Sequence, residues 1–104
     1  MKALIFLLAL AYASSAGAEQ QDREKWLGIC SDISNTGGMV MTARQKGITR
    51  EAIIKAANGD RIIGDLIETA YQAEIYPTEE ERQAMAIEFE KGLYQKCLKG
   101  APFK

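Results

Sequence analysis

The segment PTEEERQAMAIEFEKGLYQKCLKG, residues 77–100, carries a complete set of helix signals and one of the two cysteines of the chain. Thr78 and Glu81 form a capping box, in which each side chain can satisfy a free backbone N–H of the first turn. Four side chains recur at intervals of four residues and so share one helix face: Met85, Phe89, Leu93 and Cys97. Gly100 then ends the pattern. We therefore predict a helix over residues 79–98.

The other cysteine lies on a second apolar stripe, early in the chain. Steps of three and four residues place six residues on one helix face: Trp26, Cys30, Ile33, Gly37, Val40 and Arg44. This stripe predicts a helix over residues 22–46, with Gly47 as its C-cap. The Gly37-Gly38 pair either breaks this helix or lets another helix approach closely. We predict a continuous helix, because the apolar period keeps its phase through the pair.

Cys30 and Cys97 predict one disulfide, since two cysteines allow only one intramolecular pairing. Such a bond would hold the first and last helices side by side and antiparallel. Two free thiols or an intermolecular bridge are the alternatives. No C-x-x-C motif is present, which disfavours redox catalysis.

Residues 1–18 have the features of a secretory signal peptide. Lys2 supplies a positive start, and an apolar run follows it. Ala16 and Ala18 then provide the small side chains that signal peptidase requires before its cleavage point. The apolar run is shorter than the roughly 20 residues of a spanning helix, and an uncleaved anchor is the alternative. We therefore expect a periplasmic or secreted domain, residues 19–104, without stable membrane insertion after cleavage.

Two shorter helices are expected between the terminal ones. Thr49 is the N-cap candidate of a helix that ends at Asn58-Gly59. A third helix begins near Asp60 and ends near Tyr76, because Pro77 disfavours helical geometry in the residue before it. Sustained strand alternation is not visible. The predicted fold class is all-α: a small four-helix bundle stapled by one disulfide between its first and last helices.

The composition excludes several classes of function. The 104 residues include 13 Lys and Arg, 14 Asp and Glu, and no His. The near balance of charge excludes a protein that binds nucleic acid by bulk electrostatics. The missing His removes Ser-His-Asp triads and His metal sites, and with two cysteines no zinc or other cofactor is expected. Four carboxylates are candidates for acid–base chemistry: Asp60, Asp65, Glu68 and Glu74. A bundle this small has little room for a pocket, so an enzyme ranks last.

Three residues are candidates for contact with a protein partner. Arg44 continues the apolar stripe of the first helix, where its stem can also cover the core and its charge suits the helix end. Tyr76 lies at a predicted helix end and Phe103 in the C-terminal tail, so both are candidates for exposed anchors. Most other aromatic side chains are expected in the core. The same location is expected of the three later methionines: Met39, Met41 and Met85.

The chain resembles a group of small exported two-cysteine helical proteins of Gram-negative bacteria and their phages. The resemblance lies in five features: Cys30, Arg44-Gln45-Lys46-Gly47, Ala70-Tyr71, Pro77 and Cys97. It implies a disulfide-stapled helical fold in the periplasm and no particular activity. The chain is also similar to acid-activated periplasmic chaperones in its Trp26 to Cys30 spacing. It departs from them in having no dense lysine clusters at its ends.

These observations predict a small exported protein without chemistry of its own that binds another protein, as an inhibitor, an immunity protein or a phage–host interaction factor. An acid-stress chaperone is the alternative. Its pH switch would have to come from carboxylates that titrate near 4–5, because the chain has no His. The identity of the partner and the oligomeric state are left open.

Overall fold

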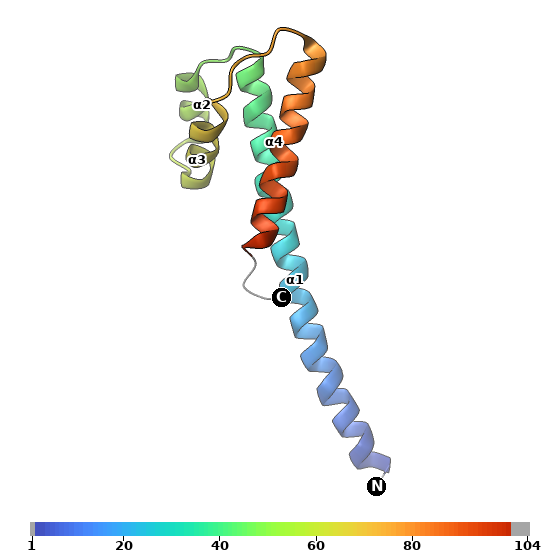
Figure 1. Ribbon diagram of the computed structural model, residues 1–104. Helices are drawn as coiled ribbons and strands as arrows, with labels where there is room; N and C mark the ends of the chain where they lie inside the picture. Colours follow the sequence, from blue (N-terminus) through green and yellow to red (C-terminus); the bar gives the residue numbers. More distant parts are fainter. Residues whose placement is uncertain (1, 101–104) are drawn as a thin grey trace.

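The computed structural model describes the backbone of residues 2–100 and the side chains of residues 20–100. Over these residues the chain forms four helices and no strand: α1 (Lys2–Gln45), α2 (Arg50–Ala57), α3 (Arg61–Ala70) and α4 (Glu79–Lys99). α1 and α4 lie antiparallel, and α2 and α3 form a short hairpin beside them (Figure 1). The N-terminal part of α1 extends past the end of α4, which makes the molecule 72 Å long, 30 Å wide and 16 Å deep. The predicted all-α fold class is confirmed.

α1 is one continuous helix and is longer than predicted. It begins at Lys2, whereas the sequence predicted a start near residue 22. The predicted leader and the first helix of the bundle are therefore one helical segment; cleavage of the leader stays a prediction. The helix passes through Gly37 and Gly38 without a break, as predicted.

No helix in the described part of the chain is both long enough and apolar enough to cross a membrane.

The two glycines of α1 mark the closest approach of α4. A Cβ atom at Gly37 would overlap the Cδ1 atom of Leu93 and would lie 3.4 Å from Cε2 of Phe89. Both of these residues belong to the apolar stripe of α4. The missing side chain thus leaves the space that Leu93 occupies, which explains why glycine is tolerated in a helix interior.

The predicted disulfide joins Cys30 of α1 to Cys97 of α4, with 5.5 Å between the two Cα atoms. It lies near the C-terminal end of α4, and 67 positions of sequence separate the two cysteines. The bond therefore holds the two terminal helices together at one end, while the chain through α2 and α3 connects them at the other. Because the cross-link closes a long loop, it removes much of the entropy of the unfolded chain.

The core is small and lies where α3 packs against α1, with side chains of α4 beside it. Four buried side chains form its centre: Val40, Met41, Ile67 and Ala70. Half-buried side chains of α4 cover it, Phe89 and Met85 among them. The expectation that most aromatic residues are core is wrong, because none of the described aromatic residues is fully buried. In its thinnest direction the bundle measures only 16 Å, so few side chains have a helix on every side.

The predicted caps hold the helix ends. The side-chain oxygens of Thr49, Asp60 and Thr78 accept hydrogen bonds from backbone N–H groups three residues later, at 2.9–3.2 Å. Asn58 and Gly47 adopt the left-handed conformation that ends α2 and follows α1. In the capping box, however, the Thr78 hydroxyl donates to the Glu81 carboxylate at 3.0 Å, a side-chain contact that the sequence pattern did not specify.

α3 is shorter than predicted. It ends at Ala70, not near Tyr76, and residues 71–78 form an irregular linker to α4. Pro77 does precede the start of α4. It disfavours helical geometry at Tyr76, but α3 has already ended at Ala70. Side chains of α1 bind the linker backbone instead, as described below.

Gly37→Ala should destabilise the protein, because the new methyl group must displace Leu93 from the α1–α4 interface. Overpacking costs roughly 1–3 kcal/mol, which outweighs the gain of about 1 kcal/mol from replacing glycine in a helix. Gly28→Ala is the matched control. Gly28 lies in the same helix, and a Cβ atom there would have no neighbouring atom within 4 Å. Thermal unfolding by circular dichroism should give a lower Tm for the first variant and an equal or higher Tm for the second. Equal Tm values for the two variants would contradict the close approach.

Loss of the disulfide should cost about 4 kcal/mol of unfolding free energy, the value that the chain-entropy model gives for a loop of this length. Urea titrations with and without reductant measure the effect on the natural chain. The double variant Cys30→Ser with Cys97→Ser is the control, because reductant should leave its unfolding curve unchanged. Coincident curves for the natural chain under both conditions would show that the bond does not support the fold.

Candidate functional site

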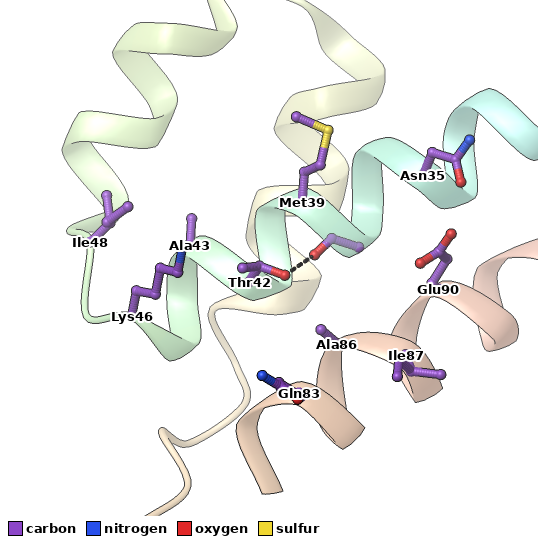
Figure 2. Close-up of a pocket in the computed structure, with 11 residues that line it drawn as sticks. Asn35, Met39, Thr42, Ala43, Lys46, Ile48, Gln83, Ala86, Ile87 and Glu90 are labelled. Atoms are coloured by element: carbon purple, nitrogen blue, oxygen red, sulfur yellow. Dashed lines mark hydrogen bonds between the residues drawn. The ribbon is translucent and has the colours of Figure 1, made fainter. Parts of the chain in front are cut away.

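An open groove runs between α1 and α4 (Figure 2). Its volume is about 730 Å³, and its lining comes from α1 and α4, with Ile48 of the following loop at its edge. A second depression of about 430 Å³ continues it along the same two helices. The two share Asn35, Ile87 and Glu90, so they form one continuous surface, which we call the α1–α4 groove.

The floor of the α1–α4 groove is made of small residues. Gly38 and Thr42 contribute from α1 and Ala86 from α4. The Thr42 hydroxyl donates a hydrogen bond of 2.8 Å to the Gly38 carbonyl, which Figure 2 shows as a dashed line. The polar groups of the floor are therefore satisfied inside α1. A binding partner would meet the methyl groups of Thr42 and Ala86 there, whereas Gly38 lies under the side chain of Glu90.

Two exposed apolar side chains stand beside this floor. Met39 is 72% exposed and Ile87 is 52% exposed. The expectation that Met39 belongs to the core is wrong, whereas its neighbour Met41 is 1% exposed and does belong to it. Sequence reasoning did not single out Ile87; the signal was an isoleucine that lies off the stripe of Met85 and Phe89 on the same helix.

Glu90 is the acidic residue of the groove. It is half-buried, and its Oε2 atom lies 2.8 Å from the position that a Cβ atom of Gly38 would take. The carboxylate thus leans from α4 across the gap toward α1 (Figure 2). Within the described part of the chain, no lysine or arginine forms an ion pair with Glu90. Among the described residues, its charge is therefore not neutralised by an ion pair.

A second polar cluster lies where α1 ends, and Gln45 is its centre. This side chain is only 3% exposed. Its Nε2 atom donates to the Glu74 carbonyl at 2.8 Å, and its Oε1 atom accepts from the Tyr76 backbone N–H at 3.0 Å. One amide thus pairs with both kinds of backbone group in the linker. Sequence reasoning did not identify Gln45, since a glutamine near a helix end carries no pattern that marks it as buried.

Arg44, a predicted partner contact, binds the same linker. Its Nε atom donates to the Ala73 carbonyl at 2.9 Å, and its guanidinium lies 5.3 Å from the centre of the Tyr71 ring. The Tyr71 hydroxyl donates to the Ile48 carbonyl at 2.8 Å. Burial raises the pKa of Tyr71; the Arg44 charge opposes this effect and Glu51 reinforces it. Arg44 therefore has an intramolecular role, and a role in partner binding stays a prediction.

The other predicted partner contacts do not meet in the groove. Tyr76 is half-buried, and its carbonyl accepts a hydrogen bond of 2.6 Å from Nε of Arg82. It lies in the linker, where its backbone N–H binds Gln45, and neither Tyr76 nor Arg44 is among the residues that line the α1–α4 groove. Phe103 lies outside the described residues. A role of Tyr76 or Phe103 in partner binding stays a prediction.

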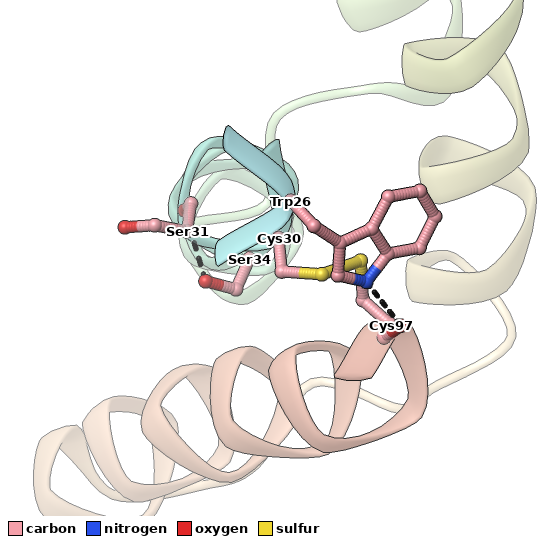
Figure 3. The surroundings of a disulfide bond; sticks show 5 residues. All are labelled: Trp26, Cys30, Ser31, Ser34 and Cys97. Atoms are coloured by element: carbon pink, nitrogen blue, oxygen red, sulfur yellow. Dashed lines mark hydrogen bonds between the residues drawn. A yellow bond between two sulfur atoms is a disulfide. The ribbon is translucent and has the colours of Figure 1, made fainter. Parts of the chain in front are cut away.

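The disulfide lies near the far end of the groove (Figure 3). Cys30 is fully buried, and the indole of Trp26 lies next to the sulfur atoms. The Trp26 Nε1 atom donates to the Cys97 carbonyl at 3.2 Å. The Ser34 hydroxyl donates to the Ser31 carbonyl at 2.9 Å on the other side of Cys30. The bond thus lies between side chains in the interior of α1 and the C-terminal end of α4, which fits a structural role.

The candidate acid–base carboxylates serve structural purposes or face solvent. Asp60 caps α3, and Glu68 forms an ion pair with Arg50. Asp65 and Glu74 are exposed. In the described part of the chain, no group of three or more Cys, Asp or Glu side chains is placed to hold a metal ion.

Gln45→Ala should lower the unfolding free energy by about 1–3 kcal/mol for each linker group left buried and unpaired. Gln95→Ala is the matched control, because it makes the same chemical change at an exposed position of α4. Urea unfolding should show a clear loss for the first variant and a change within about 0.5 kcal/mol for the second. Equal unfolding free energies for the two variants would contradict the prediction, because water would then satisfy the linker backbone as well as the Gln45 amide does.

Comparison of the chain with protein-family models, with curated proteins and with solved structures finds no match. The resemblance to small exported two-cysteine proteins therefore stays a prediction. Function has to be inferred from the groove and from the residues that line it.

Proposed function

We propose that this chain is a small exported protein without enzymatic activity that binds another protein, and that the α1–α4 groove is its binding surface. The observation that carries the proposal is the exposure of Met39 and Ile87 beside a floor of small residues. Full burial of such a side chain stabilises a complex by roughly 1.5–3 kcal/mol. Two of them lining one groove form the kind of apolar anchor on which protein interfaces depend.

The arrangement of the helices supports the same conclusion. α3 packs on α1 and supplies all of the buried residues of the two helices in the short hairpin. Only Ile48, which precedes α2, reaches the edge of the groove, and no residue of α2 or α3 lines it. The pair α1–α4 therefore has an unfilled side, which an element of a partner protein can cover.

The chemistry of the groove favours binding over catalysis. Its titratable side chains are Lys46, Glu90, Lys91 and Tyr94. General acid–base catalysis requires groups with matched pKa values in an enclosed cleft. An open groove with a single carboxylate supports recognition by shape and charge instead. Export is supported by the disulfide, which forms in oxidising compartments, and by the signal-peptide pattern of residues 1–18.

A stress chaperone is the second candidate, favoured by apolar side chains exposed outside the groove. Leu27, Ile29 and Ile62 are all more than one-third exposed. A chaperone would use such dispersed side chains to hold many unfolded clients. Light scattering of an aggregation-prone client at pH 2–3 tests this directly. Suppression of aggregation that Ile87→Glu leaves intact would support the chaperone, and no suppression would exclude it.

Ile87→Glu should abolish saturable capture of the partner from periplasmic extract, because the new charge would be desolvated at the centre of the interface. Ile62→Glu is the matched control: it makes the same change at a side chain of equal exposure, 56% against 52%, outside the groove. Quantitative pull-down over a range of bait concentrations should give saturation for the natural chain and the control only. Absence of any saturable partner, or equal capture by both variants, would contradict the proposal.

A further inference from the structure

We infer that the occupant of the α1–α4 groove is an amphipathic helix of the partner, with one lysine or arginine in the middle of its apolar face, and that Glu90 selects this cation. The inference rests on the proposed function and adds the chemical class of the ligand. Two independent features of the groove support it, its shape and its charge.

The shape of the groove fits a helix better than an extended strand. A strand needs partners for its own backbone N–H and C=O groups, whereas the backbone groups of α1 and α4 are already paired within those helices. A helix satisfies its backbone internally and presents only side chains. The lining on α1 extends from Ser31 to Lys46, which corresponds to about 22 Å at 1.5 Å per residue. A partner helix of about four turns therefore matches the groove in length.

The floor lets such a helix approach closely. Thr42 and Ala86 leave the helix backbones thinly covered, whereas the Glu90 side chain covers Gly38; Met39 and Ile87 lie beside them. Packed helices lie about 8–10 Å apart, and the smaller value requires small residues at the contact. A third helix laid over this floor would bury both exposed apolar side chains at once.

The charge comes from Glu90. Its side chain lies against Gly38 in the groove and forms no ion pair with a lysine or arginine in the described part of the chain. Covering an unpaired carboxylate with an apolar surface costs several kcal/mol. A lysine or arginine on the occupant removes this cost and forms a charge-assisted hydrogen bond. Glu90 therefore rejects an occupant that is wholly apolar or acidic at this point.

The other charges limit how basic the occupant can be. Lys46 lies on one side of Glu90 along the groove and Lys91 lies in its continuation. A helix that is basic over its whole length would face like charges at both of these positions. The groove thus fits one central cation with apolar or acidic neighbours, and not a polybasic segment.

Synthetic helical peptides of 16 residues can test this inference with the purified oxidised protein. Three peptides share an apolar face of Leu and Ala and differ at one central position, which is Lys, Glu or Leu. We expect fluorescence anisotropy to give about tenfold tighter binding of the Lys peptide than of either other peptide, the usual scale for a desolvated charge pair. Glu90→Gln should remove this preference, and Glu90→Lys should reverse it in favour of the Glu peptide.

Glu88→Lys is the matched control, because it makes the same charge change at an exposed position of α4 that does not line the groove. It should keep the preference for the Lys peptide. A preference that Glu90→Lys does not alter would overturn the inference, and so would failure of all three peptides to bind. A dimer in sedimentation equilibrium that Ile87→Glu dissociates would also overturn it, because the occupant would then be a second copy of the chain.

The same variants separate this inference from the proposed function. Capture of the natural partner that Ile87→Glu abolishes and Glu90→Lys leaves intact would refute the role of Glu90 and retain the groove as the binding surface. Loss of capture in both groove variants, with Glu88→Lys unaffected, would support both proposals.

Discussion

The close approach of α4 to α1 at Gly37 is the contact on which the rest of the structure depends. Because Gly37 has no side chain, Leu93 can occupy the space directly beside the backbone of α1. The short distance between the helices brings Cys97 within bonding reach of Cys30. It also places Glu90 against Gly38, so that the gap between the helices becomes a shallow groove with a floor of small residues. The disulfide and the candidate binding surface thus share one geometric cause.

A second constraint acts at the other end of the bundle. Arg44 and Gln45 bind the carbonyls of Ala73 and Glu74, and Gln45 also binds the backbone N–H of Tyr76. These contacts fix the irregular linker against the end of α1. Since α4 begins directly after this linker, they also set where α4 starts along α1. The small core between α1, α3 and α4 is therefore supported by polar contacts at one end and by a covalent bond at the other.

Local sequence signals predicted much of the fold, because caps and apolar periods act within a few residues. Thr49, Asp60 and Thr78 mark helix starts in the sequence and in the structure. The pairing of Cys30 with Cys97 followed from the number of cysteines. The end of α3 was predicted wrongly, because the contacts that hold the linker join residues 29 positions apart and leave no periodic trace. The groove was missed for a similar reason. The apolar stripes of α1 and α4 identify the faces that pack toward the core, but they do not show that another side of this helix pair stays uncovered.

The position of Trp26 has a practical consequence. It is the single tryptophan of the chain, and its indole lies beside the Cys30–Cys97 bond with its N–H bound to the Cys97 carbonyl. A neighbouring disulfide quenches an excited indole by accepting an electron from it. We therefore expect the emission of Trp26 to be dim while the two sulfur atoms are joined and to brighten when they separate. In the purified protein, this tryptophan can therefore serve as an optical reporter of the oxidation state of the bond.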